Sequence, residues 1–409
     1  QMFPYLPAQS GYNKRLRKAA GLMQTMIRVL ATETLMVPSL AYAVRLVCGT
    51  MKLLLAGGGT GGHLFPAIAL AEQFKMEEPQ GEVLFVGTEQ GLEARMLPEL
   101  GWPLETIVMS GWAGRGFLAK FKVVGQLVKS LGQARKILQR FGPDVVIGVG
   151  GYASVPTLLA AKTLAIPYLV HEQNAWPGLA NRLLGRWAKR VCLSFDDADR
   201  AFHRSATVLT GNPVRAAMEA CPNLDDQKTC LLVFGGSQGA QAINRAIVAA
   251  LPLFAEWRGK LEVIHQSGEQ GYEETLQGYR DNDWQDAEVT PFIKDMASAY
   301  ARATLIVCRA GATTLAELTA CGRPAILVPY PHAAAGHQST NARAMAAKGA
   351  AMTLEEVDLT PERLASLING LLHDRTSIRT MASAARGLAR RGASARLLQE
   401  CRAVLEEAI

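Results

Sequence analysis

The chain has 409 residues, enough for two domains, because a single hydrophobic core stops growing at roughly 250–300 residues. Its 49% hydrophobic and 19% charged residues are typical of a globular protein, and its seven scattered cysteines, none in C-x-x-C spacing, exclude a disulfide scaffold and a zinc ribbon. The net charge of +7 favours an anionic partner: nucleic acid, acidic lipid or a phosphorylated substrate.

Residues 1–50 have a mixed pattern. Basic residues precede a partly apolar stretch that ends in SLAYAV, which loosely imitates a signal peptide. Arg28, Glu33 and Pro38 interrupt the apolar run, so we predict neither secretion nor a membrane span. We treat residues 1–50 as an extension outside the folded domains, which begin at Met51.

The first well-defined unit, KLLLAGGGTGGHLFPAIALAEQF, is an apolar strand, a glycine loop and a helix. Glycines let the backbone approach a phosphate closely, and the amino end of the following helix offers free N–H groups. Gly57, Gly59 and Gly62 match the dinucleotide fingerprint G-x-G-x-x-G, but in FVGTEQG, where the next strand ends, Gly87 and Thr88 stand where the acidic residue is expected, and Glu89 comes too late to be a good candidate. We therefore predict a phosphate-facing loop and no nicotinamide or other cofactor.

His63 directly follows this loop. Beside a phosphate site, an imidazole can act as a general base for a sugar hydroxyl or donate to a phosphate. A lone histidine is usually a capping or packing residue, but the position at the mouth of the expected cleft favours a role in the site.

Residues 114–142 form a basic amphipathic stretch, and no acidic residue occurs from Gly111 through Gly142. Its apolar residues recur near helical spacing with lysines and arginines between them, as in helices that bind anionic membranes. A helix that packs on the core and shows a basic face to solvent is an equally good interpretation for most of it. We find no RRM, KH or zinc-finger pattern, so nucleic acid is disfavoured as the partner. The predicted membrane-contacting residues are Phe117, Leu118, Lys120, Phe121 and Lys122.

The stretch SFDDADR places Asp197 and Asp199 in the D-x-D spacing by which one class of sugar-nucleotide enzymes holds a divalent cation. It follows a predicted strand and sits among charged residues, so a solvated turn is the better interpretation. We predict no catalytic metal.

Short β-branched runs alternate with helical stretches from Met51 onwards, which predicts parallel β-α-β units with buried sheets. A second series opens at TCLLVFGGSQGAQAINRAI like the first, with a strand, a glycine turn and a helix. Between the two series, TGNPVR has the composition of an interdomain turn. The pattern predicts an α/β protein of two doubly wound, Rossmann-like domains, residues 51–212 and 213–390, whose strand carboxyl ends face a central cleft.

In the second series, CRAGATTLAEL reads as the end of a strand, a turn at Gly311 and a new helix that Thr313 and Thr314 can cap. The amino end of this helix would stabilise a diphosphate without a metal. Glu317 falls one turn further on, where its carboxylate could accept two ribose hydroxyls. A capping-box residue is the competing interpretation.

Together these stretches resemble the MurG family of glycosyltransferases, which transfer GlcNAc from UDP-GlcNAc to the undecaprenyl-pyrophosphoryl-muramoyl-pentapeptide precursor of peptidoglycan. The motifs, in chain order, are GGGTGGHLFPAIALA, VGGYASVP, HEQNAWPGLANRLL, GNPVR, FGGSQGA, HQSG, PFIKDMASAYARATLIVCRAGATTLAEL and HQSTNA. The resemblance spans Met51 to the C-terminus and implies a B-type glycosyltransferase fold, with the acceptor- and membrane-facing domain first and the UDP-GlcNAc domain second. It also implies a C-terminal helix, residues 391–409, that returns to the first domain, and a peripheral position at the cytoplasmic face of the plasma membrane.

By the family pattern, both domains would contact the donor. Ile293 would meet the uracil through its backbone, Glu317 the ribose, and Gln338 the sugar hydroxyls. Ser237 and the helix near Ala312 would hold the diphosphate. The implied donor-binding residues are Thr60, Gly61, Gly62, Asn174, Arg215, Ser237, Ile293, Ala312, Thr313, Thr314, Leu315, Ala316, Glu317 and Gln338. The implied contacts of the acceptor pyrophosphate are Gly58, Gly59, Gly150, Gly151 and Tyr152.

The family's reaction inverts the anomeric centre, so it needs a base near the acceptor hydroxyl and charge stabilisation for departing UDP. His63 is the first candidate for this base, with Glu172 and a substrate-assisted route as rivals. Gly336 stands where many relatives carry an acid, which leaves the sugar contacts of that loop open.

Two other functions stay open at this point. A UDP-sugar 2-epimerase would use the same two-domain architecture without a lipid acceptor. A non-catalytic membrane-associated scaffold that binds cell-wall precursors would still use the basic stretch.

Overall fold

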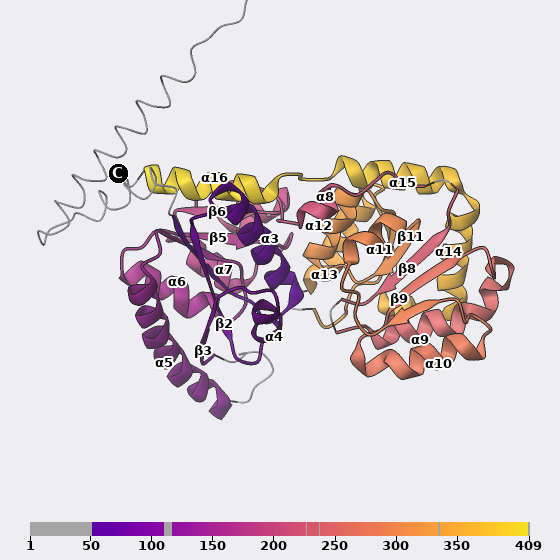
Figure 1. Cartoon of the computed structure of the whole chain (residues 1–409), viewed down its shortest axis with the longest axis horizontal. Helices are drawn as coiled ribbons and strands as arrows, with labels where there is room; N and C mark the ends of the chain where they lie inside the picture. Colours follow the sequence, from indigo (N-terminus) through magenta and orange to yellow (C-terminus); the bar gives the residue numbers. More distant parts are fainter. Residues whose placement is uncertain (1–50, 110–116, 226, 237, 334–335, 408–409) are drawn as a thin grey trace, which may run out of the picture.

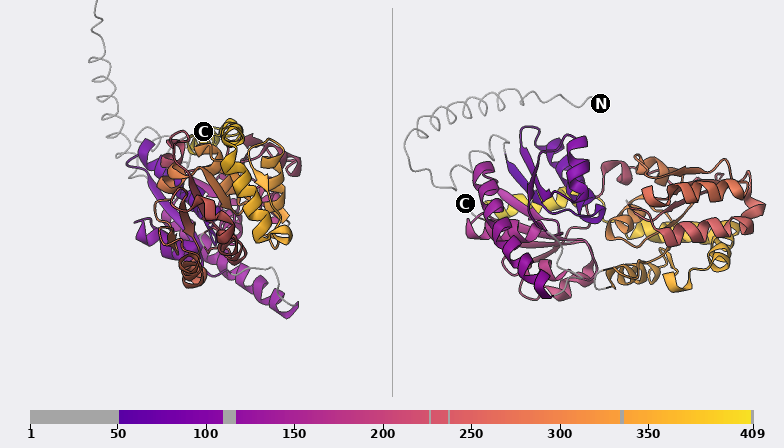
Figure 2. Two further views of the ribbon diagram at one scale, coloured as in Figure 1. Left: turned by 90° about the vertical axis from the view of Figure 1, so that its right-hand side faces the viewer. Right: turned by 90° about the horizontal axis from the view of Figure 1, so that it is seen from below.

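The computed structural model describes residues 51–109, 117–225, 227–236, 238–333 and 336–407, with the backbone alone for residues 117–125. They form two α/β domains that lie side by side along the long axis of the molecule (Figures 1 and 2). The predicted extension, residues 1–50, lies outside the described residues.

The described part of the first domain contains a sheet of seven parallel strands in the order β3-β2-β1-β4-β5-β6-β7. The strands are β1 (Lys52–Ala56), β2 (Glu82–Thr88), β3 (Leu104–Ile107), β4 (Val145–Gly148), β5 (Tyr168–Glu172), β6 (Arg190–Leu193) and β7 (Thr207–Leu209). The helices are α3 (Gly61–Glu77), α4 (Leu92–Glu99), α5 (Phe117–Phe141), α6 (Ser154–Thr163), α7 (Leu179–Gly185) and the 3-10 turn η1 (Asp196–Ala201).

Both faces of this sheet are covered, which explains why its central strands are continuous apolar runs. In β1, Leu53 and Leu55 pack in the core cluster that contains α3, whereas Leu54 and Ala56 pack in the cluster that contains α5 and α6. Successive side chains of β1 point to opposite faces of the sheet, so this one strand contributes to two separate hydrophobic cores.

The described part of the second domain contains six parallel strands in the order β10-β9-β8-β11-β12-β13. The strands are β8 (Cys230–Phe234), β9 (Glu262–Gln266), β10 (Glu288–Thr290), β11 (Leu305–Cys308), β12 (Ala325–Leu327) and β13 (Met352–Thr353). The α-helices are α8 (Ala216–Glu219), α9 (Gln241–Ala250), α10 (Tyr272–Asp281), α11 (Met296–Arg302), α12 (Ala312–Cys321), α13 (His337–Ala346), α14 (Pro361–His373) and α15 (Arg375–Gly387). The 3-10 turns are η2 (Leu251–Trp257), η3 (Glu269–Gly271) and η5 (Glu356–Asp358). The predicted α/β class with two doubly wound parallel sheets is confirmed.

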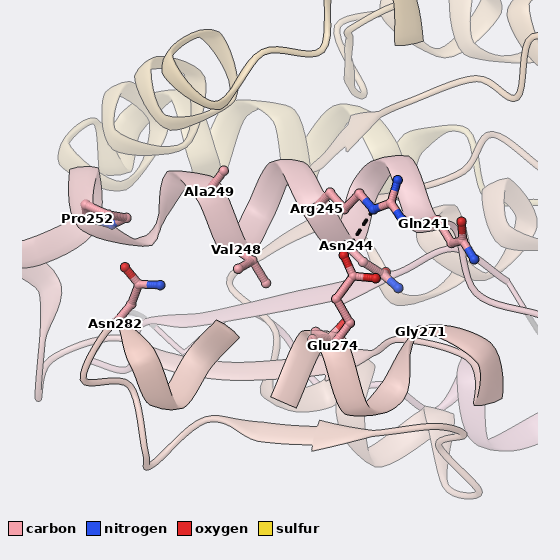
Figure 3. A pocket seen from close by; sticks show the side chains of 10 residues that line it. Gln241, Asn244, Arg245, Val248, Ala249, Pro252, Gly271, Glu274 and Asn282 are labelled. Carbon is pink, nitrogen blue, oxygen red and sulfur yellow. Dashed lines mark hydrogen bonds and ion pairs between the residues drawn. The ribbon is translucent and has the colours of Figure 1, made fainter. Parts of the chain in front are cut away.

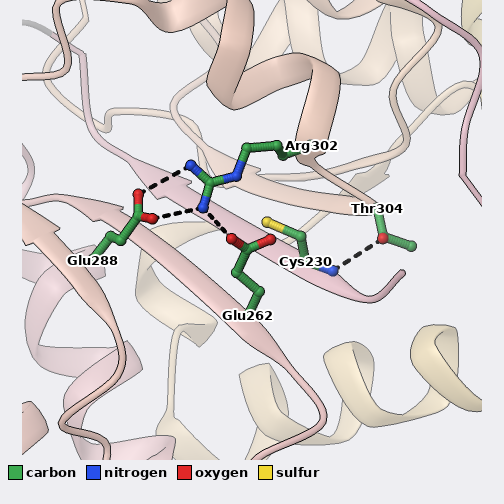
Figure 4. A network of polar contacts seen from close by, with 5 residues as sticks. All are labelled: Cys230, Glu262, Glu288, Arg302 and Thr304. Atoms are coloured by element: carbon green, nitrogen blue, oxygen red, sulfur yellow. Dashed lines mark hydrogen bonds and ion pairs between the residues drawn. The ribbon is translucent and has the colours of Figure 1, made fainter. Parts of the chain in front are cut away.

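Polar side chains tie together the amino ends of the strands in the second sheet (Figure 4). Arg302 forms ion pairs with Glu262 at the start of β9 and with Glu288 at the start of β10, the latter at 2.7 Å. The hydroxyl of Thr304 accepts a hydrogen bond from the amide of Cys230 at 3.0 Å. This cluster lies at the end of the sheet opposite the strand carboxyl ends, so it stabilises the domain away from the expected ligand side.

The last helix, α16 (Ala393–Glu406), lies along the first domain, whereas the preceding α15 lies along the second (Figure 1). Arg402 pairs with Glu77 and Glu78 at the end of α3, and Arg396 donates to the carbonyl of Thr210 at 2.9 and 2.7 Å. The C-terminal segment therefore spans both domains. The residues of α16 that enter the core of the first domain are Leu397, Leu398, Cys401, Val404 and Leu405.

Each sheet has a switch point, where the strand order reverses between two central neighbours. These are β1 and β4 in the first domain and β8 and β11 in the second. In open parallel sheets, ligands bind beyond the strand carboxyl ends at such points. The turns that leave these four strands are the glycine-containing stretches singled out in the sequence, residues 57–60, 149–153, 235–240 and 309–311.

Candidate active site

The two loops at the first switch point are in direct backbone contact. Gly57, Gly58 and Gly59 have φ angles of +148°, +136° and +87°, in the region that favours glycine. A Cβ on Gly57 would lie 2.2 Å from the carbonyl oxygen of Gly150, and one on Gly151 would lie 2.4 Å from that of Gly58. No side chain fits between the loops, so the glycines bring the turn after β1 against the turn after β4.

Glu93, in the first turn of α4, lies beneath this loop and is missing from our sequence prediction. Its side chain is only 1% exposed, and the carboxylate accepts hydrogen bonds from the amides of Gly59 (2.6 Å) and Thr88 (2.8 Å) and from the Thr88 hydroxyl (3.0 Å). The Gly59 amide is therefore engaged from within the protein, so the predicted acceptor contact at Gly59 cannot use its N–H in this arrangement. An acidic residue in the first turn of a helix is normally exposed to solvent, so the sequence pattern did not predict that Glu93 is buried beneath the loop.

His63 lies in the first turn of α3 and packs against Gly150. A Cβ on Gly150 would lie 2.7 Å from both Nδ1 and Cε1 of the imidazole, so this edge of the ring faces the loop after β4. Burial lowers the pKa of His63 below its usual value, and the carboxamide of Gln173 and the backbone of Val149 oppose this in part. The imidazole is therefore neutral at neutral pH, which is the form that accepts a proton.

Glu172, the other candidate base, sits at the end of β5 with its carboxylate already occupied. It accepts hydrogen bonds from the amide and side chain of Asn174 (2.9 and 3.2 Å), the amide of Gly178 (3.1 Å) and the side chain of Asn181 (2.9 Å). Burial raises the pKa of Glu172, and these donors lower it in part. The residue holds the segment after β5 in place, so its carboxylate is engaged in hydrogen bonds within the protein.

The amino end of α12 faces the first domain. The hydroxyl of Thr313 donates to the carbonyl oxygen of Gly62 at 3.0 Å, which joins the first turn of α12 to the first turn of α3. As far as the described residues show, neither helix has a side-chain cap or an acidic residue in its first turn. The first amides of each helix have no intrahelical acceptor, so two positive helix ends meet at the domain junction.

Helix ends in the second domain are of both kinds, and α8, α9, α10 and α13 lack a side-chain cap just as α12 does. The side chains of Asp295, Thr360 and Asp374 cap α11, α14 and α15 by accepting backbone hydrogen bonds. The helices whose first turns meet at the junction lack this neutralisation, which suits an anionic ligand there.

Glu317 lies one turn inside α12 and is 9% exposed. Burial raises its pKa to about 7, although Arg215 and the hydroxyl of Tyr300, which donates to Oε2 at 3.3 Å, both lower it. The guanidinium of Arg215 also lies over the ring of Phe65 in α3, 5.8 Å from its centroid. Arg215 therefore connects the buried carboxylate of the second domain to the first helix of the first domain.

Gln266, at the end of β9, organises the loops around the second switch point and was not predicted. Its Oε1 accepts the amide of Ile293 at 2.9 Å, and its Nε2 donates to the carbonyl of Gly236 at 2.8 Å. The amide of Ile293 is thus engaged, and the predicted backbone contact with uracil is left to its carbonyl oxygen. Ser237, predicted to bind the diphosphate, lies outside the described residues.

Asn341 in α13 provides a second link across the domains that the sequence did not reveal. Its Oδ1 accepts the amide of Ala175 at 3.2 Å, and its Nδ2 donates to the carbonyl of Ala310 at 3.3 Å. The same helix carries Gln338, whose Oε1 accepts the amide of Tyr330 at 2.9 Å. Gly336 has a φ of +64° at the start of α13, a conformation that glycine tolerates better than the acid expected from relatives.

The remaining predicted residues divide into three groups. The first group lies around the junction. Thr60 precedes α3, and Gly61 and Gly62 begin it, beside Thr313. Tyr152 is exposed after β4, and Thr314 and Ala316 are partly exposed on α12. Ala312 and Leu315 are buried, and Leu315 belongs to the core of the second domain. The side chains of the predicted membrane residues Phe117, Leu118, Lys120, Phe121 and Lys122 lie outside the described residues.

Asp197 and Asp199 lie in the exposed turn η1. Asp197 pairs with Arg200 at 3.5 Å, and Asp199 accepts a hydrogen bond from Thr207. In the described part of the chain, no three His, Cys, Asp or Glu side chains are grouped as metal ligands.

A hollow of about 290 Å³ lies between α9 and α10, away from these residues (Figure 3). Its lining includes Asn244, Val248 and an ion pair between Arg245 and Glu274 at 3.1 Å. None of the residues predicted for donor or acceptor lines it.

Two Rossmann-like domains whose switch points and uncapped helix ends meet at one junction define the architecture of a B-type glycosyltransferase. Residues 53–193 match the glycosyltransferase family 28 N-terminal domain, and residues 230–397 match the family 28 C-terminal domain. The predicted B-type fold is confirmed.

Relatives specify the family further. The chain is 57% identical over 354 residues to the UDP-N-acetylglucosamine–N-acetylmuramyl-(pentapeptide) pyrophosphoryl-undecaprenol N-acetylglucosamine transferase of Syntrophotalea carbinolica, covering 87% of this chain and 99% of the relative. The enzyme of the same name from Geobacter sulfurreducens is 47% identical over 356 residues, covering 86% and 98%. The chain belongs to this family of N-acetylglucosamine transferases, and the resemblance to the MurG family is confirmed.

Solved structures agree. MurG of Acinetobacter baumannii matches with a TM-score of 0.68 and 35% identity, covering 86% of this chain and 99% of that one. A putative UDP-N-acetylglucosamine 2-epimerase from Listeria monocytogenes matches with a TM-score of 0.62 at 14% identity, covering 88% and 97%. The second likeness shows the shared fold alone.

The role of Glu93 can be tested with Glu93→Gln. The amide side chain cannot accept from all three donors, so at least one hydrogen bond to a charged acceptor is lost, at about 1.5–3 kcal/mol. Hydrogen exchange of residues 57–60 is expected to accelerate by roughly 10- to 100-fold, read by mass spectrometry. Glu99→Gln, at an exposed position of the same helix, should leave the exchange unchanged, and equal behaviour of the two variants would contradict the role.

Proposed function

We propose that the chain transfers GlcNAc from UDP-GlcNAc to the muramoyl sugar of undecaprenyl-pyrophosphoryl-MurNAc-pentapeptide, with inversion at the anomeric carbon. The observation that carries this proposal is the junction between Thr313 and Gly62, where two uncapped helix ends meet. The names of the relatives support the donor and the acceptor. A reaction between two diphosphate-bearing substrates requires two anion sites close together, one from each domain.

The donor side belongs to the second domain. The first amides of α12 would bind the diphosphate of UDP-GlcNAc and stabilise the charge that develops as UDP departs. Glu317 would accept the ribose hydroxyls, with Arg215 close enough to favour the ionised carboxylate. Gln338 and the loop that carries it would contact the sugar.

The acceptor side belongs to the first domain. The amino end of α3 and the loop of Gly150 and Gly151 would receive the acceptor pyrophosphate. The neutral imidazole of His63 takes the proton of the acceptor hydroxyl as its oxygen bonds to the anomeric carbon. The bond from that carbon to the β-phosphate oxygen breaks in the same step, and UDP leaves with the electron pair.

The labelled-transfer assay tests the reaction. UDP-[14C]GlcNAc and the lipid-linked MurNAc-pentapeptide in detergent micelles should give labelled lipid at the same rate with and without EDTA, because the proposed site uses helix amides where other enzymes use a metal. His63→Gln should lower kcat by about 10²–10⁴-fold, the usual contribution of a general base. His373→Gln, on the exposed face of α14, is the matched control and should keep full activity.

Two outcomes would oppose the proposal. Release of an epimerised sugar nucleotide without any acceptor would favour the 2-epimerase, whose fold is shared. Full activity of His63→Gln would remove His63 as the base, and no transfer by folded wild-type protein would reject the reaction itself.

Donor binding should depend on pH through Glu317. Its pKa is raised to about 7, and ribose hydroxyls bond to the ionised form, so affinity is present above pH 7 and is lost as the pH falls through 7. The Kd for UDP-GlcNAc, measured by calorimetry, should be roughly tenfold weaker at pH 6 than at pH 8, the ratio of ionised fractions. Glu317→Gln should bind weakly at both values without this dependence, whereas Glu274→Gln should behave as wild type. A tenfold change that persists in Glu317→Gln would assign the titration to another group.

Exposed apolar side chains on and beside α7 support membrane association. Leu179 and Leu183 lie in α7, with Trp176 before it and Trp187 after it, and all four are 44–65% exposed. Such apolar side chains with cations beside them support a peripheral position on an anionic membrane surface, and we propose the cytoplasmic face of the plasma membrane, as the resemblance implies. The described helices include none that is long and apolar enough to span a bilayer.

Basic side chains flank these apolar side chains. Arg182 lies 5.9 Å from the ring centroid of Trp176, and the ammonium group of Lys162 in α6 lies 3.5 Å from that of Trp187. α7 packs on α6, and α6 packs on α5, the helix that contains most of the basic amphipathic stretch of the sequence analysis. We did not predict these exposed apolar side chains, because a short apolar helix after a strand usually packs in the hydrophobic core.

The membrane contact can be tested with Leu179→Ser combined with Trp187→Ser. Loss of two inserted apolar side chains, each about 1.5–3 kcal/mol, should lower the partition coefficient onto vesicles of 25% anionic phospholipid by more than tenfold. Turnover of a soluble acceptor analogue should stay within twofold. Leu253→Ser, at an exposed position of the second domain, should change neither quantity. Equal losses of vesicle binding and turnover would show that these side chains stabilise the fold instead of contacting the membrane.

A further inference from the structure

Two polar atoms at the first switch point are buried without a hydrogen-bond partner of good geometry among the described residues. They are Nδ1 of His63 and Oε1 of Gln173, the residue that follows β5. Buried polar atoms in folded proteins are nearly always paired, so each such atom requires an explanation. The side chain of Gln173 is also the strongest polar neighbour acting on the His63 ring.

The orientation of Gln173 follows from its other contacts. His171 Nε2 lies 3.2 Å from the carbonyl oxygen of Gly211, which can only accept, so the proton of this neutral imidazole is on Nε2. His171 Nδ1 must then accept, and the group that faces it at 3.2 Å is Nε2 of Gln173. The same Nε2 donates its second hydrogen to the carbonyl of Val149 at 2.7 Å. Both amide hydrogens are used, and Oε1 remains as an acceptor without a donor.

His63 offers the complementary group. Its Nδ1 edge is turned toward the loop after β4, against Gly150, while the residue as a whole is partly exposed at the domain junction. A buried Nδ1 that faces acceptors is stable as N–H. In a neutral imidazole, a proton on Nδ1 leaves the lone pair on Nε2.

We infer that Gln173 is a positioning residue for the transfer reaction: its Oε1 accepts the Nδ1–H of His63 and so holds the tautomer whose Nε2 lone pair faces the domain junction. This inference rests on the proposed role of His63 as base. The second nitrogen of a catalytic histidine needs such a partner, because the wrong tautomer presents an N–H to the acceptor hydroxyl and cannot take its proton.

Gln173 is itself linked to further buried polar groups through His171. His171 Nε2 is also 3.3 Å from the hydroxyl of Ser194, and Gly211, its carbonyl partner, belongs to the turn that leads to the second domain. The orientation of the base is thus fixed by a row of buried groups that runs from the interdomain connection to the junction. Burial of this row keeps His171 neutral, with a pKa of about 4.

A neutral amide suits this position. A carboxylate in place of Gln173 would stabilise the imidazolium of His63 and raise its pKa. The ionisable groups that act on His63 are His337, which lowers its pKa, and Glu93, which raises it. The amide orients the ring without adding a charge to this set.

The tautomer can be observed directly in the complete protein without substrates. The chain has seven histidines, so 15N-histidine labelling with His63→Gln as the assignment variant identifies the His63 ring signals. At pH 7.5 the inference requires a protonated Nδ1 and an unprotonated Nε2. A protonated Nε2 in the wild type would overturn it.

Variants add a second readout. Gln173→Leu removes the acceptor, so the His63 ring should become a mixture of tautomers and kcat should fall by about 10–100-fold while the donor KM stays within twofold. Gln173→Glu keeps an oxygen acceptor and adds a charge, so the acidic limb of the kcat profile should move to higher pH. Tyr168→Phe, which removes one buried hydrogen bond from the same strand, is the control and should leave tautomer and kcat unchanged. An unchanged tautomer in Gln173→Leu would overturn the inference.

The two proposals fail separately. A protonated His63 Nε2 together with full transfer activity rejects the role of Gln173 and leaves the reaction standing. A protonated Nδ1 together with no transfer of label by folded protein rejects the proposed reaction and leaves the tautomer assignment standing.

Discussion

Two helix amino ends meet where the domains touch, and the hydrogen bond from Thr313 to the carbonyl of Gly62 fixes them there. Each end carries roughly half a positive charge, so their approach is unfavourable unless an anion lies between them or a side chain neutralises them. In the described part of the chain, neither end has an acidic first turn or a side-chain cap. This positive potential supports the proposal that diphosphates bind at this junction.

Close backbone contact between two loops of the first domain explains why they contain glycines. The turn after β1 and the turn after β4 touch backbone to backbone, and a Cβ at Gly57 or Gly151 would collide with the opposite loop. Glu93 accepts hydrogen bonds from the amide of Gly59 in this loop and from the amide of Thr88 at the end of β2, and so joins the loop to the second strand. The glycines of the fingerprint-like sequence therefore allow close packing of the two loops.

Sequence patterns predicted the sheets and the loops that follow their strands. Apolar β-branched runs and glycine turns are local signals, and they predicted the α/β class, the second glycine loop and the helix that begins at Ala312. Glu93, Gln173, Gln266 and Asn341 escaped prediction because their role lies in partners far along the chain. Glu93 contacts a residue 34 positions away, Gln173 one 24 away, Gln266 one 27 away and Asn341 one 166 away. A polar residue in such a contact has no periodicity that distinguishes it from a solvated one.

The central claim is that the diphosphate of the donor lies on the amino end of α12, across from α3. A crystal structure of the protein with UDP-GlcNAc tests it most directly. The account predicts diphosphate oxygens within hydrogen-bond distance of the amides of residues 312–314, with the ribose on Glu317 and Arg215 nearby. A diphosphate bound instead in the hollow between α9 and α10, beside Arg245, would contradict it.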